Sequence, residues 1–92
     1  MAITESKSKD KHWQVYILRC ADNSLYTGVT NDIEARLLAH NNGAGARYTR
    51  GRLPVRLLYS EPAAGRSEAQ KREAAIKKLS RDKKQALISA AK

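Results

Sequence analysis

Two short runs of β-branched and aromatic residues near the start of the chain constrain the fold most strongly. They are Trp13 to Arg19 and Leu25 to Thr30, and the link between them includes Asp22, Asn23 and Ser24. Residues of the first kind favour extended strands, and Asp, Asn and Ser favour turns. The pattern predicts a β-hairpin, against which the rest of the chain must pack.

The segment after the hairpin combines a helix pattern with a basic loop. Apolar residues recur at helical spacing over 33–41, Asn31 or Asp32 can cap this helix, and Gly43 can stop it. Residues 42–54 are rich in glycine and arginine and have little periodicity, which predicts a long surface loop. Loops of this length in small domains usually have a function.

The last third of the chain predicts one more strand and two helices. Residues 55–60 form the strand pattern, a capping-box pattern starting at Ser67 opens one helix, and Ser80 or Asp82 starts the other. The predicted class is α+β with the order β-β-α-β-α-α. A chain of 92 residues can build one core, so we expect a single domain over 12–92. Residues 1–11 are polar, which predicts a disordered tail.

The charge of the chain points to a polyanionic partner. Lysine and arginine number 18 against 9 acidic residues, which gives a formal net charge of +9. We therefore expect nucleic acid as the partner. No apolar run is long enough for a membrane span or a signal peptide, which predicts no membrane association and a cytoplasmic location. Cys20 is the single cysteine, so no disulfide can form within the chain.

The hairpin contains two tyrosines and a glycine of chemical interest. Tyr16 and Tyr26 share a face of the sheet if the strand register is even, and Gly28 then lies opposite or diagonal to Tyr16. That arrangement would leave bare backbone beside two phenols. Ordinary strand tyrosines and a glycine at a bulge remain the alternative.

The first predicted helix places Arg36 and His40 on one face. Their i, i+4 spacing stacks them one above the other, at the rim of the apolar stripe that includes Ile33 and Leu37. They are candidates for a site that borders the sheet. Alternatively, Arg36 faces solvent and His40 interacts with the C-terminal dipole of the helix.

Glu73 is the most informative acidic residue. It lies on the same helical stripe as Ala69 and Ile76, whereas the exposed positions of this segment carry basic residues. A half-buried carboxylate must pair with a cation or bind a metal ion. Arg36 or a lysine would make it a structural ion pair, and Mg²⁺ would make it part of a catalytic site.

Basic residues gather in two places that are suited to tracking phosphates. One is the arginine-rich loop, and the other is the segment 66–84, where eight lysine or arginine residues face three acidic ones. The candidates for nucleic-acid contacts are Arg47, Tyr48, Thr49, Arg50, Lys77 and Lys78.

Taken in chain order, these features resemble the GIY-YIG nuclease superfamily, and within it the small, stand-alone, single-domain bacterial branch. The resemblance is carried by Val15-Tyr16-Ile17, Tyr26-Thr27-Gly28, Arg36 with His40, and Glu73. It covers the chain from Trp13 to about Ile88. It implies a three-stranded antiparallel sheet flanked by helices, which agrees with the order of elements read above.

The resemblance also implies a chemistry. Tyr16 and Tyr26 would line the cleft, one of them as general base for the attacking water. Arg36 would contact the scissile phosphate, and His40 would hydrogen-bond the phosphate or relay a proton. Glu73 would hold one Mg²⁺ or Mn²⁺ ion, weakly without substrate, because one carboxylate alone binds Mg²⁺ poorly.

The implied function is a metal-dependent endonuclease that hydrolyses nucleic-acid phosphodiesters. DNA is favoured and RNA is possible as the substrate, with structured or damaged DNA, and therefore DNA repair, as an expected setting. The alternatives are a nucleic-acid-binding module with this fold but without turnover, and a small basic protein that docks onto a larger nucleoprotein assembly. We expect a monomer or a weak dimer.

The sequence departs from the family pattern at several positions. Gln14-Val15-Tyr16 stands where the family has Gly-Ile-Tyr, and Thr27 stands where isoleucine is usual. No asparagine follows Asn42, so a polar residue that many active members place near the end of the domain is missing. We expect no separate DNA-binding domain. Binding by the basic loop and helices alone would be weak, salt-sensitive and poorly sequence-specific.

Overall fold

The hairpin predicted from the first two apolar runs forms the middle of the fold. In the computed structural model, which describes residues 12–91, its strands are β1 (Gln14–Arg19) and β2 (Leu25–Thr30). Asn23 in the turn has a φ of 70°, a left-handed conformation that asparagine tolerates better than most residues. The tail predicted for residues 1–11 lies outside the described residues.

A third strand completes an antiparallel sheet and makes β1 its central strand. β3 (Arg56–Pro62) pairs with β1, so the strand order is β2-β1-β3. The pairing of β1 with β3 shifts by one residue between Ile17 and Leu18, which indicates a bulge in β3. The predicted strand began one residue earlier and ended two residues earlier.

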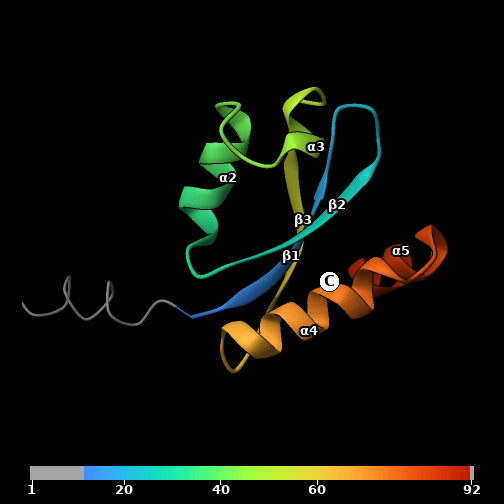
Figure 1. The fold of residues 1–92 in the computed structure, drawn as a ribbon. Coiled ribbons are helices and arrows are strands. Elements are labelled where there is room, and N and C mark those ends of the chain that lie inside the picture. Colours follow the sequence, from blue (N-terminus) through green and yellow to red (C-terminus); the bar gives the residue numbers. More distant parts are fainter. Residues whose placement is uncertain (1–11, 92) are drawn as a thin grey trace, which may run out of the picture.

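Helices cover both faces of this sheet (Figure 1). The helices are α2 (Ile33–Asn41), α3 (Arg47–Arg50), α4 (Arg66–Lys77) and α5 (Arg81–Ala90). The first two lie on one face and the last two on the other. The predicted α+β class with its three-stranded antiparallel sheet is confirmed.

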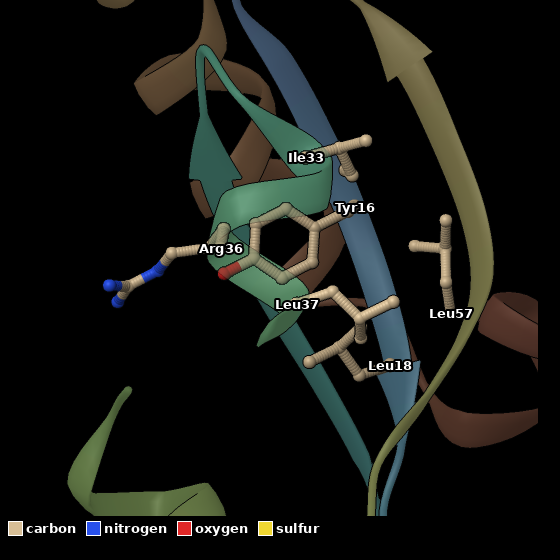
Figure 2. Close-up of a pocket in the computed structure, with 6 residues that line it drawn as sticks. All are labelled: Tyr16, Leu18, Ile33, Arg36, Leu37 and Leu57. Atoms are coloured by element: carbon tan, nitrogen blue, oxygen red, sulfur yellow. The ribbon is translucent and has the colours of Figure 1, made fainter. Parts of the chain in front are cut away.

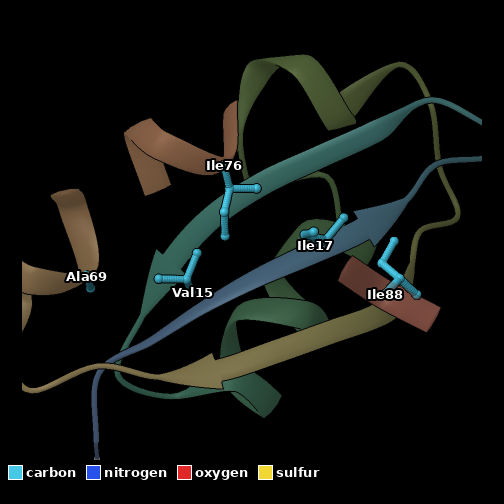
Figure 3. Packing of buried hydrophobic residues seen from close by; sticks show 5 residues of the cluster. All are labelled: Val15, Ile17, Ala69, Ile76 and Ile88. Carbon is cyan, nitrogen blue, oxygen red and sulfur yellow. The ribbon is translucent and has the colours of Figure 1, made fainter. Parts of the chain in front are cut away.

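Alternation along β1 assigns its side chains to the two layers. Val15 and Ile17 pack with Ala69 and Ile76 of α4 and with Ile88 of α5, and all five side chains are buried (Figure 3). Burial of an isoleucine or valine side chain stabilises a fold by about 1.5–3 kcal/mol. This cluster therefore fixes α4 against the sheet and with it the position of Glu73.

The opposite layer is built around the intervening residues of β1. Tyr16 and Leu18 pack with Cys20 and Val55 in a second buried cluster, to which Ile33 and Leu37 of α2 add. Cys20 is a free, buried thiol, as expected for a small apolar residue next to a strand. The face of the sheet that carries Tyr16 is therefore covered by α2.

The helix caps agree with the predictions in two cases out of three. Asp32 caps α2 by accepting a hydrogen bond from the backbone N–H of Ala35, and Ser80 caps α5 in the same way through Lys83. The capping box at Ser67 is wrong. The helix begins at Arg66, with Gly65 at the N-cap, and no side chain caps it.

Residues 42–54 contain less irregular structure than predicted, because part of the segment is helical. Gly43 has a φ of +81° just after α2, as expected for a residue that ends a helix. The short helix α3 then interrupts the predicted loop and packs against α2. No helix within residues 12–91 is both long and apolar enough to cross a membrane.

Candidate active site

The strand register brings the two tyrosines of the hairpin onto one face. Tyr16 pairs with Gly28 and Leu18 pairs with Tyr26, so the register is even and Tyr16 lies diagonal to Tyr26. Their ring centroids are 6.4 Å apart. A Cβ atom placed on Gly28 would lie 2.5 Å from the hydroxyl oxygen of Tyr16. The Tyr16 phenol therefore requires glycine on the neighbouring strand.

His40 lies against both phenols. Its ring centroid is 6.0 Å from that of Tyr16 and 5.4 Å from that of Tyr26, in edge-to-face arrangements. We predicted a histidine at the rim of the buried surface, but the side chain is completely buried. Gly45 and Thr49 from the segment after α2 cover it.

A chain of hydrogen bonds runs through this histidine. Tyr16 Oη is 2.9 Å from His40 Nε2, and His40 Nδ1 is 2.8 Å from Thr49 Oγ1. The Thr49 hydroxyl donates its single proton to the carbonyl oxygen of Ala46 at 3.0 Å. Thr49 therefore accepts the other bond, and the proton on the histidine ring is at Nδ1.

This assignment determines the direction of the Tyr16–His40 bond. A neutral imidazole with its proton on Nδ1 has a lone pair on Nε2, so the Tyr16 hydroxyl donates to it. Burial lowers the pKa of His40 from its ordinary value of 6.5, and the charge of Arg36 lowers it further. Near neutral pH, His40 is therefore a proton acceptor aimed at the Tyr16 hydroxyl.

The environment also holds Tyr16 in its protonated form. Burial raises the pKa of Tyr16 above its ordinary value of 10.0, Arg36 acts in the opposite direction, and the charges of Tyr26 and Glu73 raise it again. Tyr16 alone is thus a poor base near neutral pH. It becomes an effective base only when its own proton moves to His40 as it accepts another.

Arg36 borders the phenol on the outer side of α2. Tyr16 and Arg36 line a shallow depression together with Leu18, Ile33, Leu37 and Leu57. Figure 2 shows the Arg36 guanidinium extending away from these apolar side chains, on the side to which the Tyr16 hydroxyl points. A cation in this position is suited to meet a phosphate that approaches the phenol.

Glu73 lies on α4, which packs on the face of the sheet opposite to the Tyr16 side chain. α4 packs over β2 and β1, and the Glu73 carboxylate contributes to raising the pKa of Tyr16. The side chain is 21% exposed, and Oε2 lies 3.2 Å from Nζ of Lys77. Of the two structural pairings that we considered, the lysine pairing is the one present.

The donor set near Glu73 fits a metal ion only with help from a ligand. Among residues 12–91, no three histidine, cysteine, aspartate or glutamate side chains gather closely enough to hold an ion. Mg²⁺ commonly binds through one or two carboxylates and completes its shell with water and substrate phosphate. The lone Glu73 carboxylate is compatible with that mode, provided that the substrate displaces or shares Lys77.

The candidate nucleic-acid contacts divide into exposed residues and one buried residue. The exposed residues are Arg47, Tyr48, Arg50, Lys77 and Lys78. Thr49 is wrong as a surface contact, because its side chain is fully buried against His40. The prediction of an exposed loop is wrong at this residue because no pattern along the chain indicates the short helix α3.

Two residues of the site were missed. A Cβ atom on Gly45 would overlap Nδ1 of His40 and lie 2.8 Å from its Cα atom, so this glycine is needed for the loop to close over the ring. Arg52 donates to Asp22 at 3.0 Å and to the carbonyl oxygen of Tyr48 at 2.7 Å, which joins the hairpin turn to α3. The glycine-rich composition of the loop was the one available signal, and it could not single out Gly45.

The fold, the paired tyrosines, and the arginine, histidine and glutamate around them agree with a family assignment. A family model described as the GIY-YIG catalytic domain matches residues 12–86. The chain therefore belongs to the GIY-YIG domain family.

Within this family, the relatives are small proteins of similar length. A UPF0213 protein of Clostridium perfringens is 61% identical over 75 residues, which are 82% of this chain and 81% of the relative. A UPF0213 protein of Staphylococcus saprophyticus is 56% identical over 80 residues, 87% of this chain and 96% of the relative.

Solved structures agree with this placement. The solution structure of a UPF0213 protein from Bacillus halodurans is 46% identical, with a TM-score of 0.56 over 86% of this chain and 84% of that one. A solution structure from E. faecalis is 44% identical, with a TM-score of 0.57 over 86% of this chain and 83% of that one. The names of these relatives state no activity or metal.

Proposed function

We propose that the chain is a metal-dependent endonuclease that hydrolyses phosphodiester bonds in nucleic acid, with DNA as the favoured substrate. The observation that supports this most directly is the hydrogen-bond chain from Tyr16 through His40 to Thr49. It supplies a phenol with a proton acceptor behind it, in a family whose matching model is a catalytic domain. The net charge of +9 favours a polyanionic substrate.

The proposed proton transfers start at the attacking water. Tyr16 Oη accepts a proton from the water while the proton of Tyr16 passes to His40 Nε2, and the oxygen of the water forms a bond to phosphorus. Thr49 then accepts a hydrogen bond from a positively charged imidazolium. The bond from phosphorus to the leaving oxygen breaks, and solvent supplies the proton that this oxygen needs. The His40 imidazolium then returns its extra proton to solvent through Tyr16, which restores both side chains. No proton is created or lost in these steps.

The remaining residues balance charge. Arg36 would contact a non-bridging oxygen of the phosphate, where negative charge grows in the transition state. Glu73 would hold one Mg²⁺ or Mn²⁺ ion, which supplies further stabilisation of that charge. Lys77 is paired with Glu73 in the structure, so the metal ion, together with the substrate phosphate, would have to replace Lys77 as the partner of this carboxylate.

Matched pairs of variants test the proposal. With Mg²⁺ or Mn²⁺ at low salt, the parent protein should nick plasmid DNA, and Tyr16→Phe or Glu73→Ala should abolish nicking while leaving binding within a few fold. Tyr59→Phe removes a hydroxyl that bonds Glu61 instead, and Glu68→Ala removes a carboxylate from the exposed side of the same helix. Both controls should nick at the parent rate. Cleavage that survives in Tyr16→Phe and Glu73→Ala would overturn the site assignment.

One observation favours a second candidate, a nucleic-acid-binding module without turnover. The ion pair with Lys77 already satisfies one oxygen of Glu73. If the chain is such a binding module, nucleic acid would bind equally well with Mg²⁺ and in EDTA, and no metal ion would produce cleavage of DNA or RNA.

A further inference from the structure

A second hollow lies next to the candidate site, at the edge of the sheet formed by β2. It has a volume of about 330 Å³, and three of its lining residues, Leu25, Tyr26 and Thr27, come from this strand. Tyr48 of α3 forms one wall, and Lys77 of α4 and Lys84 of α5 form another. We call it the β2-edge groove.

From this groove we infer a subsite for one unpaired nucleotide that flanks the scissile phosphate, which makes single-stranded nucleic acid the preferred occupant on that side. The inference deepens the proposed endonuclease function and rests on it for the position of the scissile phosphate. The groove itself can be tested without any cleavage.

The aromatic wall supplies a surface on which a base can stack. The Tyr26 and Tyr48 rings are stacked, with centroids 6.0 Å apart and an interplanar angle of 22°. The Arg52 guanidinium lies 4.0 Å from the centroid of the Tyr48 ring, and Tyr48 remains 40% exposed. Tyrosine and arginine planes both stack on nucleic-acid bases, with little dependence on sequence.

Tyr26 joins the groove to the candidate active site. Its ring lies 5.4 Å from that of His40 and also lines the groove. A nucleotide stacked on the Tyr26–Tyr48 pair is therefore a direct neighbour of a phosphate held at Tyr16 and Arg36. This adjacency places the subsite on the same strand as the bond that is cut.

The opposite wall supplies positive charge from two different helices. Lys77 is paired with Glu73, whereas Lys84 has no ion pair with any residue of the described range 12–91. A phosphate in the groove would give Lys84 its partner. It would also compete with Glu73 for Lys77, and so free the carboxylate that the proposed metal ion requires.

Thr27 supplies an unmatched hydrogen-bonding group. Its side chain is 3% exposed, and its Oγ1 atom has no hydrogen-bond partner within the part of the chain that the structure describes. Buried hydroxyls are nearly always bonded, so this one requires an explanation. Thr27 lines the groove, and a rotation of its buried side chain would bring Oγ1 within reach of a sugar, base or phosphate oxygen seated there.

The size of the groove favours an unpaired strand over a duplex. A volume of about 330 Å³ is at the lower end of the range for small-molecule pockets, so it suits one nucleotide. Stacking on tyrosine also requires a base that has left the stack of its own strand. A paired base meets neither condition.

Binding in EDTA, where the proposed reaction is stopped, tests the groove directly. We would measure fluorescence anisotropy with labelled oligothymidine, an RNA oligonucleotide of the same length, and a blunt DNA duplex with the same number of phosphates. The single strands should bind more tightly than the duplex. Equal or tighter binding of the duplex would overturn the inference.

Variants separate the contributions of the two walls. Tyr48→Leu should weaken oligothymidine binding about 5- to 150-fold, the range for loss of one base–aromatic stack. Tyr48→Trp should restore it, which excludes a mere folding defect. Thr27→Val, which keeps the shape of the side chain, should cost about 2- to 10-fold.

A lysine pair provides the matched charge control. Lys84→Ala should lower the salt dependence of binding by about one phosphate contact, whereas Lys71→Ala, which removes an exposed lysine paired with Glu68, should not. If Tyr48→Leu and Lys84→Ala both bind like the parent, the groove is not the subsite.

Failure of this inference can be told apart from failure of the proposed function. Nicking by a protein that prefers duplex would refute the groove and leave the endonuclease standing. Preference for single strands by a protein that cuts nothing would refute the endonuclease and leave the groove standing.

Discussion

Replacing Gly28 by alanine tests whether Tyr16 can hydrogen-bond His40 only because Gly28, on the neighbouring strand, has no side chain. The added Cβ atom would lie 2.5 Å from Oη and 2.7 Å from Cζ of Tyr16. Nonbonded carbon atoms rest about 3.5–4.0 Å apart, so the end of the phenol must move by roughly 1 Å. The 2.9 Å hydrogen bond between Tyr16 and His40 would then be lost.

Stability and chemistry should respond differently to this substitution. The clashing atoms are at the end of a side chain that can rotate, so the loss of stability should be at the lower end of the roughly 1–3 kcal/mol typical of overpacking. Misplacing a catalytic group by about 1 Å can reduce the rate about 100-fold. Gly28→Ala should therefore stay folded and lose most of its nicking activity.

Two assays and one control complete this test. Nicking of plasmid DNA measures the rate, and the ¹⁵N chemical shifts of the His40 ring report its bond to Tyr16 independently of activity. Gly51→Ala is the control, since its added Cβ meets no atom within 4 Å and its φ is −94°. Parent-like nicking together with unchanged His40 shifts in Gly28→Ala would refute the reasoning.

Three further predictions concern His40. Gly45→Ala pushes against the backbone of His40, 2.8 Å away at Cα, so it should cost about 1–3 kcal/mol, and thermal melting should show a Tm drop of roughly 4–8 °C per kcal/mol. Thr49→Val removes the oxygen that accepts the hydrogen bond from Nδ1–H of His40. The ¹⁵N shifts of the His40 ring should then show a mixture of tautomers and nicking should slow, whereas Thr49→Ser should restore the single tautomer and the parent rate. A single tautomer in Thr49→Val would contradict this. Because the folded-state pKa of His40 lies below 6.5, the unfolded chain binds more protons, so stability to urea should fall as pH drops through and below 6.5, less so in His40→Gln. An equal pH dependence in both proteins would count against a buried neutral His40.

The arrangement of elements could be read from the sequence because local signals and burial agreed. The run of β-branched and aromatic residues in β1 predicted a strand, and Asp32 and Ser80 predicted where two helices begin. The capping box at Ser67 failed because α4 begins one residue earlier, at Arg66, after an extended Gly65 that has no side chain to cap it. Local patterns predict elements well where no tertiary contact competes with them.

The depth of His40 could not be predicted in the same way. Helical periodicity placed the residue at the rim of the apolar stripe, but its burial depends on Gly45 and Thr49 returning from the following loop. Such contacts link residues on different elements, and no spacing along one helix reveals them. For the same reason, the prediction that Thr49 lies at the surface was wrong.

The position of Gly28 directly opposite Tyr16 could not be predicted for a different reason. The register of a hairpin decides which side chains share a face, and a slip of one residue would have separated the tyrosines. The observed turn at Asn23 gives the even register. The pairing of Glu73 with Lys77 was likewise one of several possibilities that the sequence left open.

We propose that Tyr16, His40, Arg36 and Glu73 act together to hydrolyse phosphodiesters with a divalent metal ion. The most direct measurement is cleavage at low salt of nicked, flapped, branched and linear DNA, with Mg²⁺, with Mn²⁺ and in EDTA. We predict cleavage with either metal ion, none in EDTA, and none with Tyr16→Phe. Cleavage of no substrate under any metal, or equal cleavage by Tyr16→Phe, would contradict it.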